Sequence, residues 1–143
     1  MKATRRKARG RRSGCPIGYT LEIVGDRWTL LVLRDMIFGR KRTFGEFLNS
    51  EERIATNILT DRLKRLERSG LMRKEIAGEA RRAVYELTEK GLAMVPVLLD
   101  MVVWGATYDP GTGASPEFVR RVKQERESVI AETIAALGVT SGR

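Results

Sequence analysis

Two residue types that carry much protein chemistry are nearly missing: the 143-residue chain has no histidine and one cysteine, Cys15. Histidine is the commonest general base and metal ligand, so a His-based catalytic triad and the usual zinc sites are excluded. Cys15 cannot form a disulfide within the chain, as expected for a reducing compartment such as the cytoplasm. We therefore expect no enzyme, no cofactor and no metal site.

The chain also lacks a continuous run of about 20 apolar residues, the length that crosses a bilayer. No apolar stretch follows the basic N-terminus, which argues against a secretory signal. Hydrophobic residues make up 42% of the chain, too many for a disordered protein, and the length fits one domain. These properties predict a globular cytoplasmic protein with no membrane partner.

Negative charge is scarce in two segments, and this distribution is more informative than the net charge of +9. Residues 1–14 contain seven Lys or Arg and no acid, and residues 39–82 contain twelve Lys or Arg against seven Asp or Glu. The segments 15–38 and 83–143 are slightly acidic. Such segregation indicates a polyanion-binding surface, although charge that only aids solubility is the alternative.

The first basic segment, residues 1–14, reads as a disordered basic tail. Its Arg9-Gly10-Arg11 sequence suits an extended arm in a DNA minor groove. The simpler interpretation is a tail that adds nonspecific affinity for phosphates.

Capping signals and helical periodicity predict a helix-turn-helix in the first half of the chain. Thr43 and Glu46 form a capping box that starts a short helix, and a strongly basic helix follows over about 55–69. Earlier helices are predicted over 16–24 and 27–38, the first with Cys15 as its cap residue and the second ended by Gly39. Two short helices joined by a tight turn, the second basic, are typical of a DNA-reading motif.

A hairpin is predicted directly after the basic helix, over residues 71–87, with strands 71–76 and 83–87. A hairpin in this place is a wing. Thr88 then caps a helix that we expect to run to about Trp104 with a bend at Pro96. The overall prediction is a mainly helical α+β fold, a winged helix-turn-helix with flanking dimerisation helices.

A final helix is predicted over residues 115–138, begun by Ser115-Pro116 and ended by Gly138. Its apolar stripe exceeds what a small core obviously covers, and large exposed apolar patches mark interfaces. We therefore expect a homodimer held by the flanking helices, with packing inside one chain as the alternative.

Several motifs, taken in order, resemble the HxlR-type bacterial regulators. The resemblance covers nearly all of residues 15–104. The motifs are Cys15-Pro16, Leu21–Trp28, Leu30–Asp35, Arg42–Phe47, Ile54, Leu59–Leu63, Leu66–Leu71, Val84–Thr88, Gly91, Pro96 and Trp104. Members of this family often carry a proline in the wing, which the segment Ala80–Ala83 lacks.

The resemblance implies a winged-helix homodimer that binds near-palindromic promoter DNA as a repressor or an activator. It also implies that reactive electrophiles or oxidants control some members. In its terms, residues 15–108 form the winged domain. The dimerisation role expected for the helix over residues 115–138 rests on its apolar stripe and not on the resemblance.

Candidate DNA contacts follow from the position of each residue around the basic helix and the wing. N-terminal and outward positions of a recognition helix meet base edges. Basic residues around it meet phosphates, which position the protein without reading sequence. The expected base contacts are Thr56, Asn57, Thr60, Asp61 and Lys64. The expected backbone contacts are Arg40, Lys41, Arg42, Thr43, Arg62, Arg81 and Arg82; for Arg62 a structural ion pair is an equal alternative, and Asp61 also suits pairing with an Arg.

Cys15 is the remaining candidate site. A helix N-terminus and the neighbouring Arg11 and Arg12 both stabilise a thiolate, which favours reaction with oxidants. The resemblance supports a redox-sensor role, and an incidental cysteine is the alternative.

From these residues we expect a sequence-specific, nucleoid-associated transcriptional regulator, a repressor acting as a homodimer on double-stranded DNA. Oxidation at Cys15 or a small-molecule effector would modulate it. The alternative is a nucleoid or adaptor protein that binds DNA without sequence preference.

Overall fold

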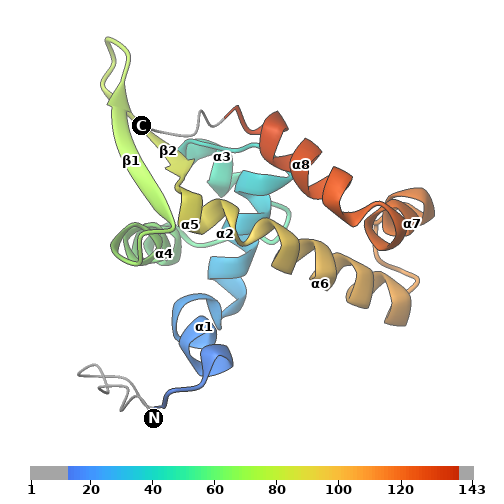
Figure 1. Cartoon of the computed structure of the whole chain (residues 1–143). Helices are drawn as coiled ribbons and strands as arrows, with labels where there is room; N and C mark the ends of the chain where they lie inside the picture. The colour runs from blue at the N-terminus through green and yellow to red at the C-terminus, as the bar shows by residue number, and fades with distance from the viewer. Residues whose placement is uncertain (1–12, 139–143) are drawn as a thin grey trace.

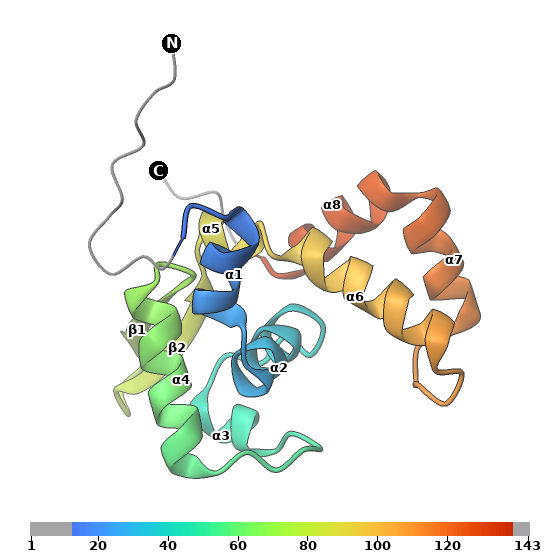
Figure 2. The same ribbon diagram turned by 90° about the horizontal axis from the view of Figure 1, so that it is seen from below.

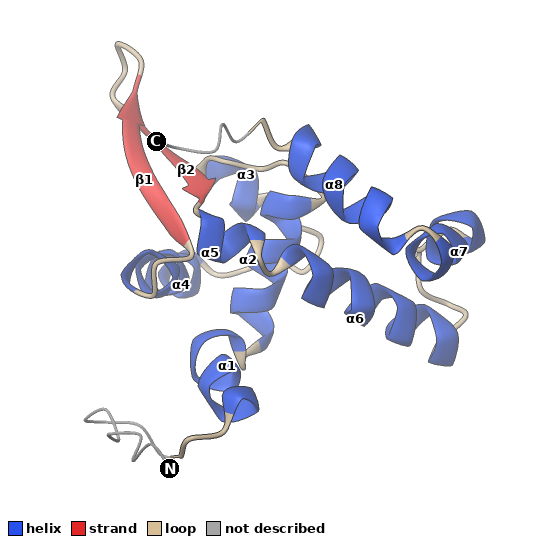
Figure 3. Cartoon of the chain, in the orientation of Figure 1, coloured by secondary structure: helices blue, strands red, loops and turns tan. Residues whose placement is uncertain are grey.

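The computed structural model of the chain describes residues 13–138, in which eight helices accompany one two-stranded sheet (Figures 1 and 3). The predicted arm Arg9-Gly10-Arg11 lies outside the described residues, as does most of the predicted tail. The elements are α1 (Pro16–Val24), α2 (Arg27–Ile37), α3 (Phe44–Leu48), α4 (Thr56–Arg68), β1 (Met72–Ala77), β2 (Arg82–Leu87), α5 (Glu89–Leu92), α6 (Val95–Tyr108), α7 (Pro116–Gln124) and α8 (Arg126–Ala136).

The first two helices begin where local chemistry favours it. Pro16 occupies the first turn of α1, where a missing backbone N–H costs nothing, and Cys15 is the cap residue without a side-chain cap bond. Asp26 caps α2: its carboxylate accepts from the backbone N–H of Thr29 at 3.0 Å and from the Thr29 hydroxyl at 2.6 Å. This second cap was not predicted from the sequence.

One apolar core joins the helices to the hairpin. Leu33 of α2, Leu59 of α4 and Leu99 of α6 are completely buried, and Phe47 of α3 packs edge to face with Tyr85 of β2. In Figures 1 and 2, α4 and the hairpin lie on one side of the molecule and α7 lies on the opposite side. The mainly helical winged architecture predicted from the sequence is confirmed.

The wing forms without a proline. β1 and β2 pair antiparallel, from Met72 opposite Leu87 to Ala77 opposite Arg82. The four-residue turn between them places Gly78 at φ 76° and Arg81 at φ 51°, and the Arg81 N–H donates to the Gly78 carbonyl at 3.1 Å. Two left-handed residues therefore reverse the chain where family members often use a proline.

The helix predicted from Thr88 to Trp104 is in fact two helices, α5 and α6. Thr88 caps α5, as predicted, by accepting from the Gly91 N–H at 3.2 Å. The chain then turns at residues 93–94, and Pro96 lies in the first turn of α6 instead of bending a continuous helix. A first-turn proline has no helical hydrogen bond to lose, so it begins this helix. α6 also continues past Trp104 to Tyr108.

The single C-terminal helix predicted over 115–138 is also wrong. Ser115 caps α7 as expected, with its hydroxyl accepting from the Phe118 N–H at 3.1 Å, but the chain breaks at Glu125 (φ −127°, ψ 40°). The break lets α8 return along α6, so that Val122 and Val129 are both buried in the core of the same chain. Much of the stripe assigned to a partner is therefore covered within one protomer.

One described segment, Glu89–Tyr108, is long and apolar enough to cross a membrane by length and composition alone. This qualifies the prediction that no such segment exists. The segment comprises α5 and α6, and its buried residues Val95, Leu98 and Leu99 belong to the protein core. Core helices of globular proteins share this composition, so the test by itself is weak evidence for a membrane.

Candidate nucleic-acid interface

Helix α4 has an apolar face and a polar face. Leu59, Leu63 and Leu66 are buried against the core. The opposite side carries the predicted base-contacting residues, which we call the reading face: Thr56, Asn57, Thr60, Asp61 and Lys64. Four of them are exposed, and Thr60 is half-buried, with its hydroxyl donating to the Thr56 carbonyl at 2.9 Å. The helix thus offers amide, hydroxyl, carboxylate and ammonium groups to solvent on one side.

The wing lies beside α4 (Figure 2). Basic residues occupy its tip. Gly70, at φ 79°, ends α4 and turns the chain directly into β1. Arg81 and Arg82 are exposed at the far end of the hairpin. The two predicted phosphate contacts therefore project beyond the reading helix.

The predicted phosphate contacts divide into paired and unpaired cations. Lys41 pairs with Asp35, Arg42 with Glu86, and Arg62 with both Asp26 and Asp61. No ion pair is formed by Arg40, Arg81 or Arg82 within residues 13–138. These three arginines have exposed and uncompensated charge, which suits them best for phosphates.

The Arg62–Asp26 pair joins the reading helix to the start of α2. Arg62 Nε lies 2.9 Å from Asp26 Oδ1, so the ion pair left open by the sequence is formed. Partial burial raises the pKa of Asp26, but hydrogen bonds from Thr29 and Arg62 outweigh it and lower that pKa to about 2. The same bond raises the pKa of Arg62. The carboxylate remains ionised and holds α4 in place.

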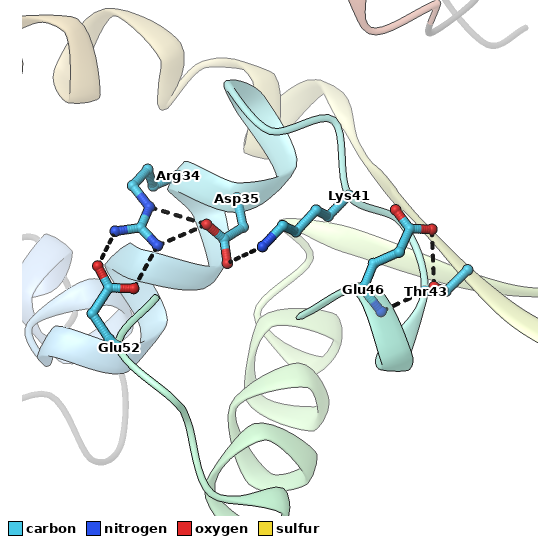
Figure 4. Close-up of polar contacts among 6 residues, drawn as sticks. All are labelled: Arg34, Asp35, Lys41, Thr43, Glu46 and Glu52. Atoms are coloured by element: carbon cyan, nitrogen blue, oxygen red, sulfur yellow. Dashed lines mark hydrogen bonds and ion pairs between the residues drawn. The ribbon is translucent and has the colours of Figure 1, made fainter. Parts of the chain in front are cut away.

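A second ionic network supports the turn between α3 and α4 (Figure 4). The Arg34 guanidinium contacts Asp35 Oδ1 at 2.8 Å and binds both carboxylate oxygens of Glu52, one at 2.8 Å. Lys41 Nζ lies 3.5 Å from the other oxygen of Asp35. Hydrogen bonds from Arg34 lower the pKa of Glu52 to about 2. The network ties α2 to the helix-turn-helix turn, away from the reading face.

The capping box at Thr43 is present with altered geometry. The Thr43 hydroxyl accepts from the Glu46 N–H at 3.3 Å and donates to the Glu46 carboxylate at 2.9 Å, where a bond to the Thr43 N–H was expected (Figure 4). Next to it, the Tyr85 N–H donates to the Arg42 carbonyl at 2.8 Å. The loop before α3 is therefore joined to the wing.

Sequence reasoning missed three residues that shape this surface: Asp26, Glu52 and Arg53. Asp26 carried a signal, since an Asp three residues before Thr29 is a helix-cap pattern. Glu52 and Arg53 carried none, because their roles depend on a residue 18 positions away and on a left-handed backbone at φ 55°.

Cys15 is exposed at the N-terminus of α1, and its backbone N–H donates to the Ser13 hydroxyl at 3.2 Å. Its thiol is therefore accessible to small oxidants. Within residues 13–138, no three His, Cys, Asp or Glu side chains gather as metal ligands would.

The chain is similar in sequence and in structure to known transcriptional regulators. The HTH-type transcriptional regulator YdeP of Bacillus subtilis (strain 168) is 40% identical over 96 residues, which span 66% of this chain and 74% of YdeP. The redox regulator HypR in its oxidised form is similar in structure, with a TM-score of 0.58 and 35% identity over 65% of this chain and 96% of HypR.

Two further solved structures share the fold. PA1607 is similar with a TM-score of 0.66 and 34% identity, covering 73% of this chain and 74% of PA1607. The reduced form of the transcriptional regulator YodB from B. subtilis has a TM-score of 0.56 and 27% identity, covering 70% of this chain and all of YodB.

The family comparison settles membership. The sequence model described as HxlR-like helix-turn-helix matches residues 23–112, more than half of the chain. The relatives are transcriptional regulators and not enzymes, and regulators of this kind meet DNA in the cytoplasm. With its exposed reading helix and basic wing, the chain belongs to the HxlR-like helix-turn-helix family of DNA-binding transcriptional regulators.

Proposed function

We propose that the protein is a homodimeric, sequence-specific repressor whose α4 enters the major groove of a near-palindromic operator. The observation that carries the proposal is the solvent-exposed reading face of α4, which is accompanied by three exposed arginines without ion pairs in the described chain, Arg40, Arg81 and Arg82. Base edges are read by side chains such as Asn57, which suits adenine, while these arginines bind phosphates. Occupation of a promoter by the dimer would then block transcription.

The exposed apolar face of the outer helices supports the homodimer. On α6, the tilted rings of Trp104 and Tyr108 pack with 5.2 Å between their centroids, and the two residues are 69% and 73% exposed. On α1, Ile17 is 70% exposed. An apolar groove of about 610 Å³ between α2 and α6 continues this surface and includes Phe38 and Met101. Large aromatic residues in such a patch mark a protein interface, and we assign it to a second copy instead of a membrane.

A two-fold symmetric dimer sets the geometry of the operator. The two α4 helices would enter successive major grooves on one face of the duplex, with half-site centres about 34 Å apart. Because several arginines per protomer meet phosphates, raising salt from 50 to 200 mM should weaken binding by about three orders of magnitude.

The decisive experiment is selection of bound DNA from a random oligonucleotide pool with the purified full chain. A recovered inverted repeat with half-sites one helical turn apart supports the proposal. Salt-sensitive binding without sequence enrichment would support the alternative, a nucleoid or adaptor protein.

We further propose that oxidation of Cys15 modulates DNA affinity. Its thiol is exposed at the end of α1, next to the face assigned to the partner, and the similar protein HypR is a redox regulator. With one cysteine, an oxidant can give a bridge between the Cys15 residues of two protomers, a mixed disulfide or a sulfenic acid. Diamide should change the operator affinity of the wild type and not that of Cys15→Ser; equal responses would refute the switch.

A further inference from the structure

Three residues other than glycine adopt left-handed backbone conformations in the described chain, and all three are arginines. They are Arg40 at φ 52°, Arg53 at φ 55° and Arg81 at φ 51°. A side chain in this region strains the backbone, and such strain persists only where surrounding contacts enforce it, often at functional sites. Arg81 lies at the tip of the wing, and Arg40 lies between α2 and α3, where it lines a cavity with β2 and the end of α8. Arg53, in the turn before α4, is the third.

The backbone of Arg53 is fixed by contacts on both sides. Its N–H donates to the carbonyl of the nearly buried Ser50 at 3.1 Å. Glu52 before it is bound through both carboxylate oxygens by Arg34 (Figure 4). Ile54 after it is 7% exposed and belongs to the core. Residues on both sides are thus anchored to the protein body, which holds Arg53 in one place.

The side chain of Arg53 has no such anchor. It is exposed and forms no hydrogen bond or ion pair with any residue in the range 13–138. The adjacent negative charge of Glu52 is already neutralised by Arg34. The Arg53 guanidinium therefore lies on an anchored turn just before α4, two residues ahead of the cap residue Ala55. It is free to bind a group outside the described chain.

We propose that Arg53 binds a DNA phosphate in each half-site and thereby fixes how α4 enters the groove. A phosphate suits it better than a base, because Arg53 precedes α4 and is not on the reading face. The planar guanidinium can donate two parallel hydrogen bonds to phosphate oxygens. The inference rests on the proposed DNA-binding function and adds a contact to it.

The test uses Arg53→Gly in the full chain, with the operator recovered by selection. Glycine accepts a positive φ, so the melting temperature should stay the same or rise while operator affinity falls about tenfold. The slope of log affinity against log salt should become shallower by about two, since a dimer loses two phosphate contacts. Lys123→Ala, an exposed charge removal on α7, is the matched control and should change neither quantity.

Two more variants separate charge from backbone effects. Arg53→Lys keeps the charge and should retain most of the affinity and the salt slope. Glu51→Gln removes an exposed acid in the same turn and should strengthen binding if this turn faces phosphates. An Arg53→Gly protein with unchanged affinity and salt slope would overturn the inference. Absence of DNA binding by the wild type would instead refute the proposed function.

Discussion

Arg62 of the reading helix and Asp26 at the start of α2 are joined by a hydrogen-bonded ion pair of 2.9 Å between Nε and Oδ1. Asp26 simultaneously caps α2 through Thr29. One carboxylate therefore starts one helix and positions another, and Arg62 is occupied by this role in the chain on its own. This relationship links the stability of the protein to the orientation of the reading face.

The depressed pKa of Asp26 predicts a defined loss of stability in acid. The pKa falls from 3.8 to about 2 on folding, so the contribution is fully present above about pH 4 and disappears as the pH falls towards 2. Asp26→Asn should lower the free energy of unfolding by about 1–2 kcal/mol at pH 7, a value reduced for solvent screening.

This is checked by denaturant unfolding of both proteins from pH 7 to pH 2. The difference between the wild type and Asp26→Asn should shrink between pH 4 and 2. Glu127→Gln, which removes an exposed acid without an ion pair in the described chain, should give a curve parallel to the wild type. A difference independent of pH would contradict the assignment.

Asn57→Ala should cost about 1–3 kcal/mol in binding to the cognate operator and relax the preference at one base pair. The reason is that Asn57 is exposed on the reading face and can bond an adenine edge through two hydrogen bonds. Competition binding with single-base operator variants measures the effect. An unaltered base preference would remove Asn57 from the reading role.

Arg82→Ala should weaken binding to all DNA sequences alike and reduce the salt slope by about one per protomer. Arg42→Ala is the comparison, because Arg42 is already paired with Glu86 and should contribute less. Affinities measured at several salt concentrations on operator and random DNA distinguish the two. An equal loss of DNA affinity in both variants would mean that the ion pairs within the chain do not predict which cations bind DNA.

Trp104→Glu should convert the proposed homodimer into a monomer. Trp104 is largely exposed in the single chain, so the change should leave the monomer fold intact while placing a charge in the interface. Sedimentation analysis reports the mass, and circular dichroism reports the fold. A wild type that sediments as a monomer at micromolar concentration would refute the interface.

Gly91→Ala should destabilise the fold by about 2 kcal/mol or more, because a Cβ at this position would lie 2.0 Å from the Leu71 carbonyl oxygen. Gly45→Ala in α3, where a Cβ meets nothing within 4 Å, should be neutral or stabilising. Thermal melts of both variants test this. Similar melting temperatures would show that α5 can move away from Leu71.

The regular part of the fold could be predicted because its signals are local. The leucine spacing of α4 and the Thr43 cap each act within a few residues. The break at Glu125 could not, since residues 117–137 contain no proline or glycine and the break accompanies the burial of Val122 and Val129, which depends on packing against the rest of the chain.

For the candidate site, the sequence identified polar residues that the structure places on the solvent side of α4 and at the tip of the wing, but it did not predict which of the cations form ion pairs. Arg40 and Arg42 look alike in the sequence, yet Arg42 meets Glu86, a residue 44 positions away, and Arg40 meets none in the described chain. Such pairings are set by tertiary packing. The left-handed backbone of Arg53 was not predicted either, because glycine or asparagine ordinarily occupies such a position.

The return of α8 along α6 has a consequence for how this protein can be divided. The family match ends at residue 112, whereas two buried residues of the core, Val122 and Val129, come after it in the sequence. The core of this chain thus extends beyond the residues that the family match covers. A chimera carrying only residues 23–112 would lose both valines and leave part of the core uncovered, so a transplanted winged domain should include α7 and α8.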